Sequence, residues 1–245
     1  LSEIRKCLPT MLAAARHVAK GEYRIVVTAA PGVDDAFYAP YLQGESLMRD
    51  TYSLLTEAQA AVVNSGTATL ETALIGCPQT AVYHVAGSKC LEWLIKPILF
   101  KIKHFTLVNI ISDKEVIQEL VASRFTEQNV EQELRRLLEN EPYRMKMKAE
   151  YESIWGILGD QHAAEGVRFP RLAQHFVAGD DLPEPSSVIK DERHSLARAL
   201  CGSYAAAADE VFRGAGIREV VGVVTRVIVK LRVASCGRLK LSTHG

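Results

Sequence analysis

The first two-thirds of the chain alternate between short continuous apolar runs and longer stretches in which apolar residues recur every three or four positions. Short apolar runs predict buried strands, and the longer period predicts amphipathic helices. The predicted strands are 23–29, 60–63, 79–85 and 105–111, and the predicted helices are 8–20 (beginning near Pro9), 52–58, 67–74, 89–100, 115–123, 127–138 and 142–158, with a helix or turn-rich segment at 34–43.

The order of these segments predicts the fold class. Strands that alternate with helices favour an α/β fold, here a Rossmann-like parallel sheet with helices on both faces. In such sheets ligands bind at the carboxyl ends of the strands. The turn that follows the strand at 60–63 therefore lies where we expect a binding site.

An anion site is the first candidate chemistry at this turn. Gly66 lets the backbone turn tightly or approach a ligand, and Thr67 can cap a helix whose first-turn N–H groups suit a diphosphate. Glu71, one helical turn further, can accept hydrogen bonds from a ribose diol. In the alternative interpretation Ser65 and Thr67 are ordinary caps and Glu71 is a solvated acid, and spacing alone favours this alternative.

Composition narrows the class of protein. The 245 residues are 48% hydrophobic, and 29 basic residues balance 29 acidic ones, so no global field points to nucleic acid. No run of about 18 apolar residues predicts a transmembrane helix, and the first residues lack the apolar core of a signal peptide. Five scattered cysteines without ligand spacing indicate reduced cytosolic thiols. They are Cys7, Cys77, Cys90, Cys201 and Cys236.

Four ordered blocks give the sequence a family resemblance. They are SGTATLE at 65–71, CPQTAVY at 77–83, TLVNII at 106–111 and VIQELV at 116–121. Together, and at these separations, they resemble lipid-A-disaccharide synthases over residues 2–178. The resemblance implies one half of a GT-B glycosyltransferase fold, in which residues 1–178 form the nucleotide-sugar (donor) binding domain with its terminal helices.

The resemblance also implies a reaction. The family transfers 2,3-diacylglucosamine from UDP-2,3-diacylglucosamine to lipid X (2,3-diacylglucosamine 1-phosphate), releasing UDP, in lipid A biosynthesis. Leu1 looks like the residue just after the family's Gly-Ser-Arg turn. The acceptor domain, which supplies the proposed catalytic base, precedes that turn. We therefore expect this chain to supply the UDP-binding half and to lack turnover alone, with the catalytic residues unknown.

Residue by residue, the resemblance extends the candidate site. It implies that Ser65, Gly66 and Thr67 hold the UDP diphosphate and that Glu71 binds the ribose hydroxyls. Asn109 matches a family Asn that contacts the donor sugar or diphosphate, and an Asx turn at a strand end is an equally weighted alternative.

Three further positions are less specific. Glu119 matches the family's Glu-Leu-Val block, although a helix-surface acid is the favoured alternative. Tyr83 belongs to the UDP-binding set because the family has Tyr-Arg or Tyr-Tyr there, and His84 is interpreted as structural or solvent-facing. Ala122 stands where a longer form of the block has Gln, which leaves any role of that amide in doubt.

We expect no metal ion and no cofactor. The charge on a UDP leaving group can be stabilised by a helix N-terminus and aligned N–H groups. The first 178 residues contain no Asp-x-Asp pair of the kind that binds a metal.

One segment, residues 91–104, bears on the possible partners of the protein. From Leu91 to His104 it mixes large apolar residues with lysines, which suits a membrane surface, and core packing explains the apolar residues equally well. Because both family substrates are acylated, the resemblance implies a cytoplasmic protein peripheral at the inner membrane. Whether the protein forms a homodimer is left open.

More than one interpretation is open for the tail of the chain and for its function. Residues 179–245 pass from a Pro- and Ser-containing linker through an Ala-rich segment to a Val-rich, strand-like stretch at 220–233. This unassigned tail is either a small appended domain or, as we favour, non-native or disordered sequence from a reading-frame or assembly artefact. For the whole chain the alternatives are a non-catalytic nucleotide-binding module and a UDP-sugar epimerase of the same fold.

Overall fold

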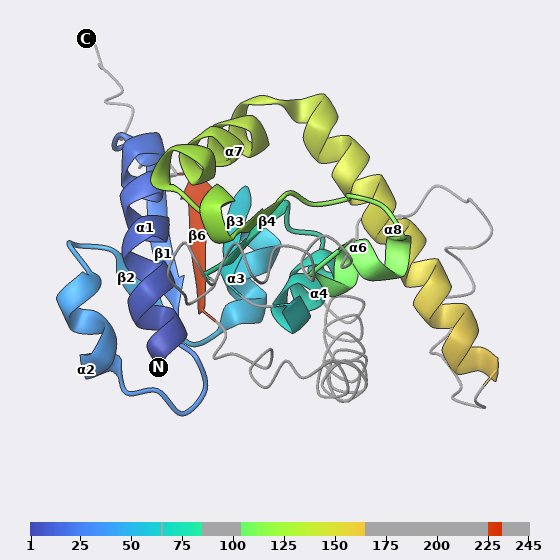
Figure 1. Cartoon of the computed structure of the whole chain (residues 1–245), viewed down its shortest axis with the longest axis horizontal. Coiled ribbons are helices and arrows are strands. Elements are labelled where there is room, and N and C mark those ends of the chain that lie inside the picture. The colour runs from blue at the N-terminus through green and yellow to red at the C-terminus, as the bar shows by residue number, and fades with distance from the viewer. Residues whose placement is uncertain (65, 85–103, 165–224, 232–245) are drawn as a thin grey trace, which may run out of the picture.

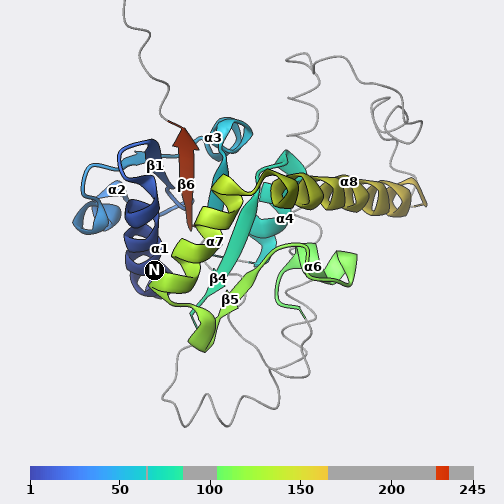
Figure 2. The ribbon, with the colours of Figure 1, turned by 90° about the horizontal axis from the view of Figure 1, so that it is seen from above.

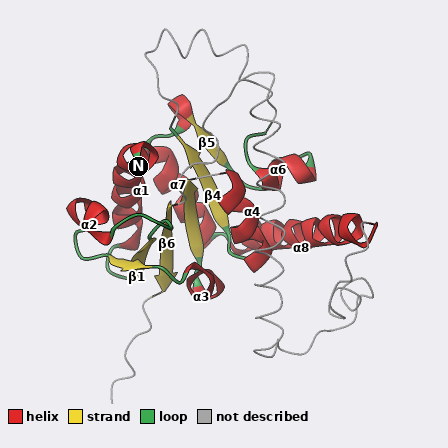
Figure 3. Ribbon diagram, turned by 90° about the horizontal axis from the view of Figure 1, so that it is seen from below, coloured by secondary structure: helices red, strands yellow, loops and turns green. Residues whose placement is uncertain are grey.

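The computed structural model describes residues 1–64, 66–84, 104–164 and 225–231. Within these residues six strands form one sheet in the order β2-β1-β6-β3-β4-β5 (Figures 1 and 3). The strands are β1 (Tyr23–Thr28), β2 (Ser46–Met48), β3 (Ala60–Asn64), β4 (Gln79–Tyr83), β5 (Glu119–Val121) and β6 (Thr225–Leu231). The helices are α1 (Ser2–Ala19), α2 (Asp35–Tyr38), α3 (Thr51–Glu57), α4 (Gly66–Ile75), α6 (Leu107–Ser112), α7 (Glu127–Glu139) and α8 (Glu141–Ala164), with short 3-10 turns at Ala39–Tyr41 and Ala122–Arg124.

Five of the six strands run in the same direction. β1 pairs with β2, β3 with β4 and β4 with β5 in parallel, and β1 and β3 are both antiparallel to β6, so they are parallel to each other. The predicted α/β fold with a Rossmann-like parallel sheet is confirmed. The exception is β6, which runs against all the others.

Helices cover both faces of the sheet, because the central strands are apolar on both sides. Val27 and Val62 pack with α1 and α7 in the larger core cluster. Val26 and Val63 face the other way, toward α3 and the start of α4. Figure 2, seen from above, shows α1 and α7 next to each other and α3 apart from both.

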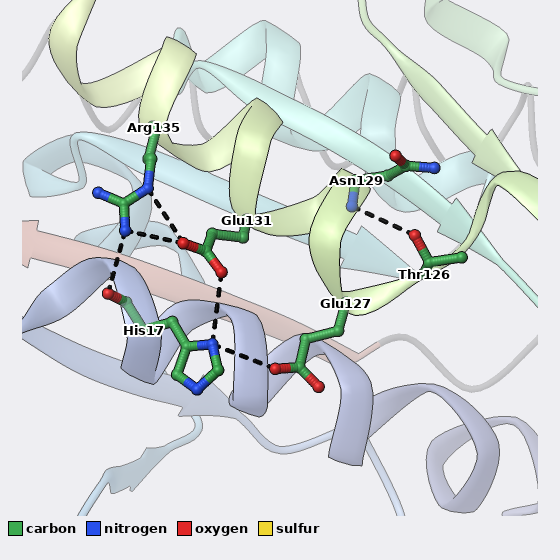
Figure 4. Close-up of polar contacts among 6 residues, drawn as sticks. All are labelled: His17, Thr126, Glu127, Asn129, Glu131 and Arg135. Carbon is green, nitrogen blue, oxygen red and sulfur yellow. Dashed lines mark hydrogen bonds and ion pairs between the residues drawn. The ribbon is translucent and has the colours of Figure 1, made fainter.

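A polar cluster on the surface joins α1 to α7 (Figure 4). Nδ1 of His17 lies 3.1 Å from Glu127 and 3.3 Å from Glu131. Arg135 donates to Glu131 at 2.8 Å and to the carbonyl of His17 at 3.4 Å. Thr126 accepts from the backbone N–H of Asn129 at 3.2 Å and so caps α7. These contacts hold the two helices side by side on one face.

The start of the first helix differs from the prediction. α1 begins at Ser2, and Pro9 lies inside it. The apolar face already includes Ile4 and Leu8, both fully buried. Tertiary burial of this face thus compensates for the backbone bond that a proline inside a helix cannot make.

Two segments near residue 110 are also corrected. The predicted strand at 105–111 is helix α6, because Thr106 accepts from the N–H of Asn109 and caps a helical turn. The predicted helix at 115–123 is a loop followed by β5 and a 3-10 turn. Ala122 has a φ of 53°, a left-handed conformation that ends regular structure there.

The tail contributes to the sheet. β6 lies in the Val-rich stretch that the sequence indicated as strand-like, and it occupies the centre of the sheet between β1 and β3. The predicted helix at 89–100 and most of the segment 91–104 lie outside the described residues. In the part that the structure describes, no helix is both long and apolar enough to cross a bilayer.

Candidate functional site

The strand and the helix predicted on either side of residue 65 are present. β3 is buried along its whole length and ends at Asn64, which is 4% exposed. Gly66 and Thr67 form the first turn of α4, and Ser65 lies outside the described residues. Glu71 follows one turn later on α4 and is half-buried. The amino end of α4 therefore lies at the carboxyl edge of the sheet, the edge at which ligands of such sheets bind.

A second group of predicted residues gathers around Glu119 at the start of β5. Its carboxylate accepts the backbone N–H of Phe105 at 3.1 Å and that of Thr106 at 2.8 Å, and it also accepts the Thr106 hydroxyl at 2.7 Å. Glu119 is 8% exposed. Hydrogen bonds of this kind satisfy a buried carboxylate, and they hold the chain that enters α6 against the sheet.

Asn109 belongs to the same group and is fully buried. Its amide donates to the carbonyl of Ile117 at 2.9 Å, and its Oδ1 accepts from the N–H groups of Val116 and Ile117 at 2.8 and 3.0 Å. The side chain thus fixes the loop between α6 and β5. This geometry is related to the Asx turn named as the alternative, except that Asn109 lies in a helix rather than at a strand end.

Tyr83 ends β4 beside this group. Its ring lies 6.4 Å from that of Phe105, and its buried hydroxyl has no hydrogen-bond partner among the described residues. Burial and the nearby charge of Glu119 raise the pKa of Tyr83 far above its ordinary value, so the hydroxyl stays a neutral donor. A buried hydroxyl without a partner costs free energy unless a ligand supplies one.

The predicted site residues therefore form two groups on adjoining strands. Gly66, Thr67 and Glu71 follow β3, whereas Tyr83 ends β4, Glu119 begins β5 and Asn109 lies on α6 before it. Val63 pairs with Ala81, and Ala81 pairs with Glu119, so Glu119 lies level with the penultimate residue of β3. α4 packs against α6, which brings the helices of the two groups together.

Sequence reasoning missed Thr106, which links Glu119 to Asn109. The Thr106 hydroxyl donates to the carboxylate of Glu119 and accepts from the backbone N–H of Asn109. The signal was available, since a Thr three residues before an Asn, at the start of an apolar run, is a helix-capping pattern. It was overlooked because the run was interpreted as a strand.

A cavity of about 310 Å³ lies at the opposite edge of the sheet, between the end of α1 and the starts of β1 and β2. Arg16 and Glu45 line it and pair with each other at 2.5 Å. Although burial raises the pKa of Glu45, the hydrogen bond from Arg16 holds this pKa below its ordinary value. The charges of Arg16 and Glu45 compensate each other, and ligands of such sheets bind at the carboxyl edge rather than at this one.

Within the described residues, no three His, Cys, Asp or Glu side chains come close enough together to hold a metal ion.

Comparison with known proteins gives this geometry a context. A family model described as lipid-A-disaccharide synthetase matches residues 2–165. A lipid-A-disaccharide synthase from Syntrophus aciditrophicus is 33% identical over 171 residues, which are 66% of this chain and 44% of that protein. The enzyme of the same name from Koribacter versatilis is 32% identical over 150 residues, which are 59% of this chain and 38% of that protein.

A third relative, the lipid-A-disaccharide synthase from Nitrosococcus oceani, is 31% identical over 165 residues, 64% of this chain and 42% of that protein. The chain thus spans less than half the length of the curated relatives it matches. The match covers α1 to α8 and includes both groups of candidate residues.

Proposed function

The chain belongs to the lipid-A-disaccharide synthetase family, and from this premise we propose that it is the part of a glycosyltransferase that binds the UDP of the sugar donor. The reaction we propose for the complete enzyme is transfer of 2,3-diacylglucosamine from UDP-2,3-diacylglucosamine to lipid X. The product serves lipid A biosynthesis, and UDP leaves. This chain alone would bind the nucleotide without turnover.

The observation that carries the proposal is the helix amino end at the carboxyl edge of the sheet. β3 ends at Asn64, and α4 begins at Gly66. First-turn N–H groups and the helix dipole favour negative charge at this point. A diphosphate seated there would be stabilised as its charge grows on departure from the sugar, which is the form of electrostatic catalysis that acts on a leaving group.

Roles for the individual residues follow from the resemblance to the family. Ser65, Gly66 and Thr67 would bind the diphosphate, and Glu71, one turn along α4, would accept hydrogen bonds from the ribose diol. Tyr83 would donate its buried hydroxyl to the donor.

The second group has a different share in the proposed site. Asn109 and Glu119 are engaged with Thr106, Val116 and Ile117, so we assign them to positioning the edge of the site beside β4. Direct contact of either with the donor sugar stays a prediction.

Titration calorimetry of the full chain with UDP tests the proposal. We expect saturable binding, and we expect addition of EDTA to leave the affinity unchanged, because N–H groups rather than a metal ion neutralise the phosphates. Thr67→Val should weaken binding by about tenfold, the effect of one lost hydrogen bond to a charged group. Thr56→Val, on the exposed side of α3, is the matched control. Absence of UDP binding by the folded chain would refute the proposal.

The proposed contact between Glu71 and the ribose can be tested with a nucleotide that lacks the 2′-hydroxyl. If Glu71 binds the diol, 2′-deoxy-UDP should bind the unchanged protein several-fold more weakly than UDP. Glu71→Gln should weaken UDP binding and reduce this discrimination, so that the two changes are not additive. Glu139→Gln, an exposed acid on α7, serves as the control. Full discrimination in Glu71→Gln would remove Glu71 from the ribose site.

A further inference from the structure

The centre of the sheet contains a slot for one strand. β1 and β3 run parallel, and each pairs with β6 rather than with the other. β6 is matched to β1 from Tyr23↔Leu231 to Thr28↔Arg226 and to β3 from Ala60↔Val229 to Asn64↔Thr225. Figures 1 and 3 show this strand between its two partners.

The parallel strands follow one another outward from this slot toward both edges of the sheet. In one direction the sheet continues through β1 and β2, and in the other through β3, β4 and β5. A doubly wound sheet has the order 3-2-1-4-5-6, in which the first strand lies at the centre and later strands are added to either side. If the slot is counted as the first strand, the five parallel strands reproduce this order with none left over.

The helices give the same answer. α4 links β3 to β4 and begins on the face where Val63 and α3 lie, whereas α1, which precedes β1, contacts β6 and packs with Val27 and Val62 on the opposite face. A connection from the slot through α1 to β1 would move across the sheet toward β2, whereas the connection from β3 through α4 to β4 moves toward β5. A crossover that moves in the opposite direction and also uses the opposite face has the same handedness. Both connections can therefore be right-handed, as parallel strands joined by a helix require.

β6 does not fit this pattern. It runs antiparallel to both neighbours, and it comes from the far end of the chain. An antiparallel strand in an otherwise parallel sheet is commonly found at an edge rather than at the centre.

We propose that the slot between β1 and β3 is the binding site for a parallel apolar strand joined directly to the amino end of α1, and that β6 occupies this site in its place. The lining strands set the chemistry of the occupant. Val26, Val27, Val62 and Val63 present apolar side chains to both faces, so the occupant must be apolar on both sides. Its carboxyl end would lie beside Asn64, next to the amino end of α4.

The experiment attaches such a strand to the full chain. A segment of sequence Ala-Val-Val-Ile-Val-Gly-Asn-Gly is fused to the amino group of Leu1, and hydrogen exchange is measured peptide by peptide. We expect the β6 amides to lose their protection, with exchange faster by roughly 100-fold, while the added strand becomes protected. The amides of β3 should remain protected, because that strand keeps a partner on both sides.

The matched control carries the same extension with Pro in place of its central Val. Proline cannot complete the ladder of a central strand, so β6 should stay protected in this version. A second comparison uses Val227→Pro, which breaks β6 itself. It should lower the Tm by more than about 10 °C in the unextended chain and in the proline control, and by less than about 2 °C in the chain with the intact extension.

Two results would overturn the proposal. One is a β6 that remains protected beside the intact extension, with Val227→Pro equally damaging in every version. The other is loss of β6 protection only in a dimer, which would mean that the added strand enters a second molecule rather than the slot beside its own α1. Neither readout involves nucleotide, so the outcome is independent of the proposed UDP site.

Discussion

Asn109 shows how a single side chain can hold a loop in place. Its carboxamide makes one donor and two acceptor bonds with Val116 and Ile117 while fully buried. The sequence offered a ligand contact and a local turn as alternatives, and it could not reveal these bonds, because their partners lie beyond the end of α6. The loop they fix leads directly into β5, which carries Glu119.

Asn109→Ala should therefore be destabilising. It would leave the N–H groups of Val116 and Ile117 buried without their acceptor, and we expect the free energy of unfolding to fall by about 3 kcal/mol. Urea denaturation followed by circular dichroism would measure this change. Asn129→Ala, which removes one exposed bond to the carbonyl of Arg124, should cost about 0.5 kcal/mol. Equal effects of the two substitutions would contradict the structural role.

Tyr83 leads to the opposite expectation. Because its hydroxyl is buried without a partner in the described structure, Tyr83→Phe should raise the free energy of unfolding by about 1 kcal/mol. If the hydroxyl serves the sugar donor, the same substitution should weaken nucleotide binding. Thermal unfolding and calorimetry on one preparation would measure both. A variant that is less stable than the parent would mean that the hydroxyl already has a partner.

At the scale of the elements, the α1–α7 contact is sensitive to acid. The hydrogen bond from Arg135, opposed by partial desolvation and aided by His17, holds the pKa of Glu131 below its ordinary value. A carboxyl with a depressed pKa stabilises the fold above its unfolded pKa and loses this contribution as the pH falls through its folded value. The contribution of Glu131 to this contact should therefore be lost at acidic pH.

Glu131→Gln tests this dependence. We expect its Tm to lie below that of the parent chain at pH 6 to 7, and the difference to shrink as the pH falls below about 4.5, the ordinary value of the group. Glu22→Gln, an exposed acid in the turn before β1, is the matched control and should give only a small difference. A constant difference for Glu131→Gln between pH 7 and pH 3 would show that the charge of Glu131 does not stabilise this contact.

The elements also show how far sequence patterns reach. β3 and β4 were predictable because both are short apolar runs between turn residues, and α7 because its cap and charges agree with its apolar face. α6 was mistaken for a strand because its six residues are too few to display a helical period. β2 has three residues and no pattern of its own. Its pairing with β1 comes from the tertiary structure alone.

For the candidate site, sequence order was a better guide than individual residues. The turn before α4 could be located from the apolar run and Gly66, because a strand, a glycine and a cap are local signals. The bonds among Thr106, Asn109 and Glu119 could not be located in this way. They join α6, which was predicted to be a strand, to β5, which was predicted to be part of a helix.

At the scale of the whole molecule, the sheet depends on a strand from the tail. Deletion of residues 179–245 would leave β1 and β3 each with an unpaired edge at the centre of the fold. We expect this shortened chain to lose more than about 10 °C of Tm or to aggregate, whereas deletion of residues 232–245 alone should change the Tm by less than about 2 °C. Scanning calorimetry and light scattering would compare the two. Equal stability of both shortened chains would mean that β6 contributes nothing.

The position of β6 also bears on how the protein is made. Residues leave the ribosome in order, at about 5–20 per second, so β1 to β5 are all exposed before Thr225 is synthesised. During that interval β6 is not yet available to pair with β1 and β3, and their open edges can pair with neighbouring nascent chains. The sheet as assembled in this structure is complete only once β6 has been made, so chaperones that shield strand edges should raise the soluble yield.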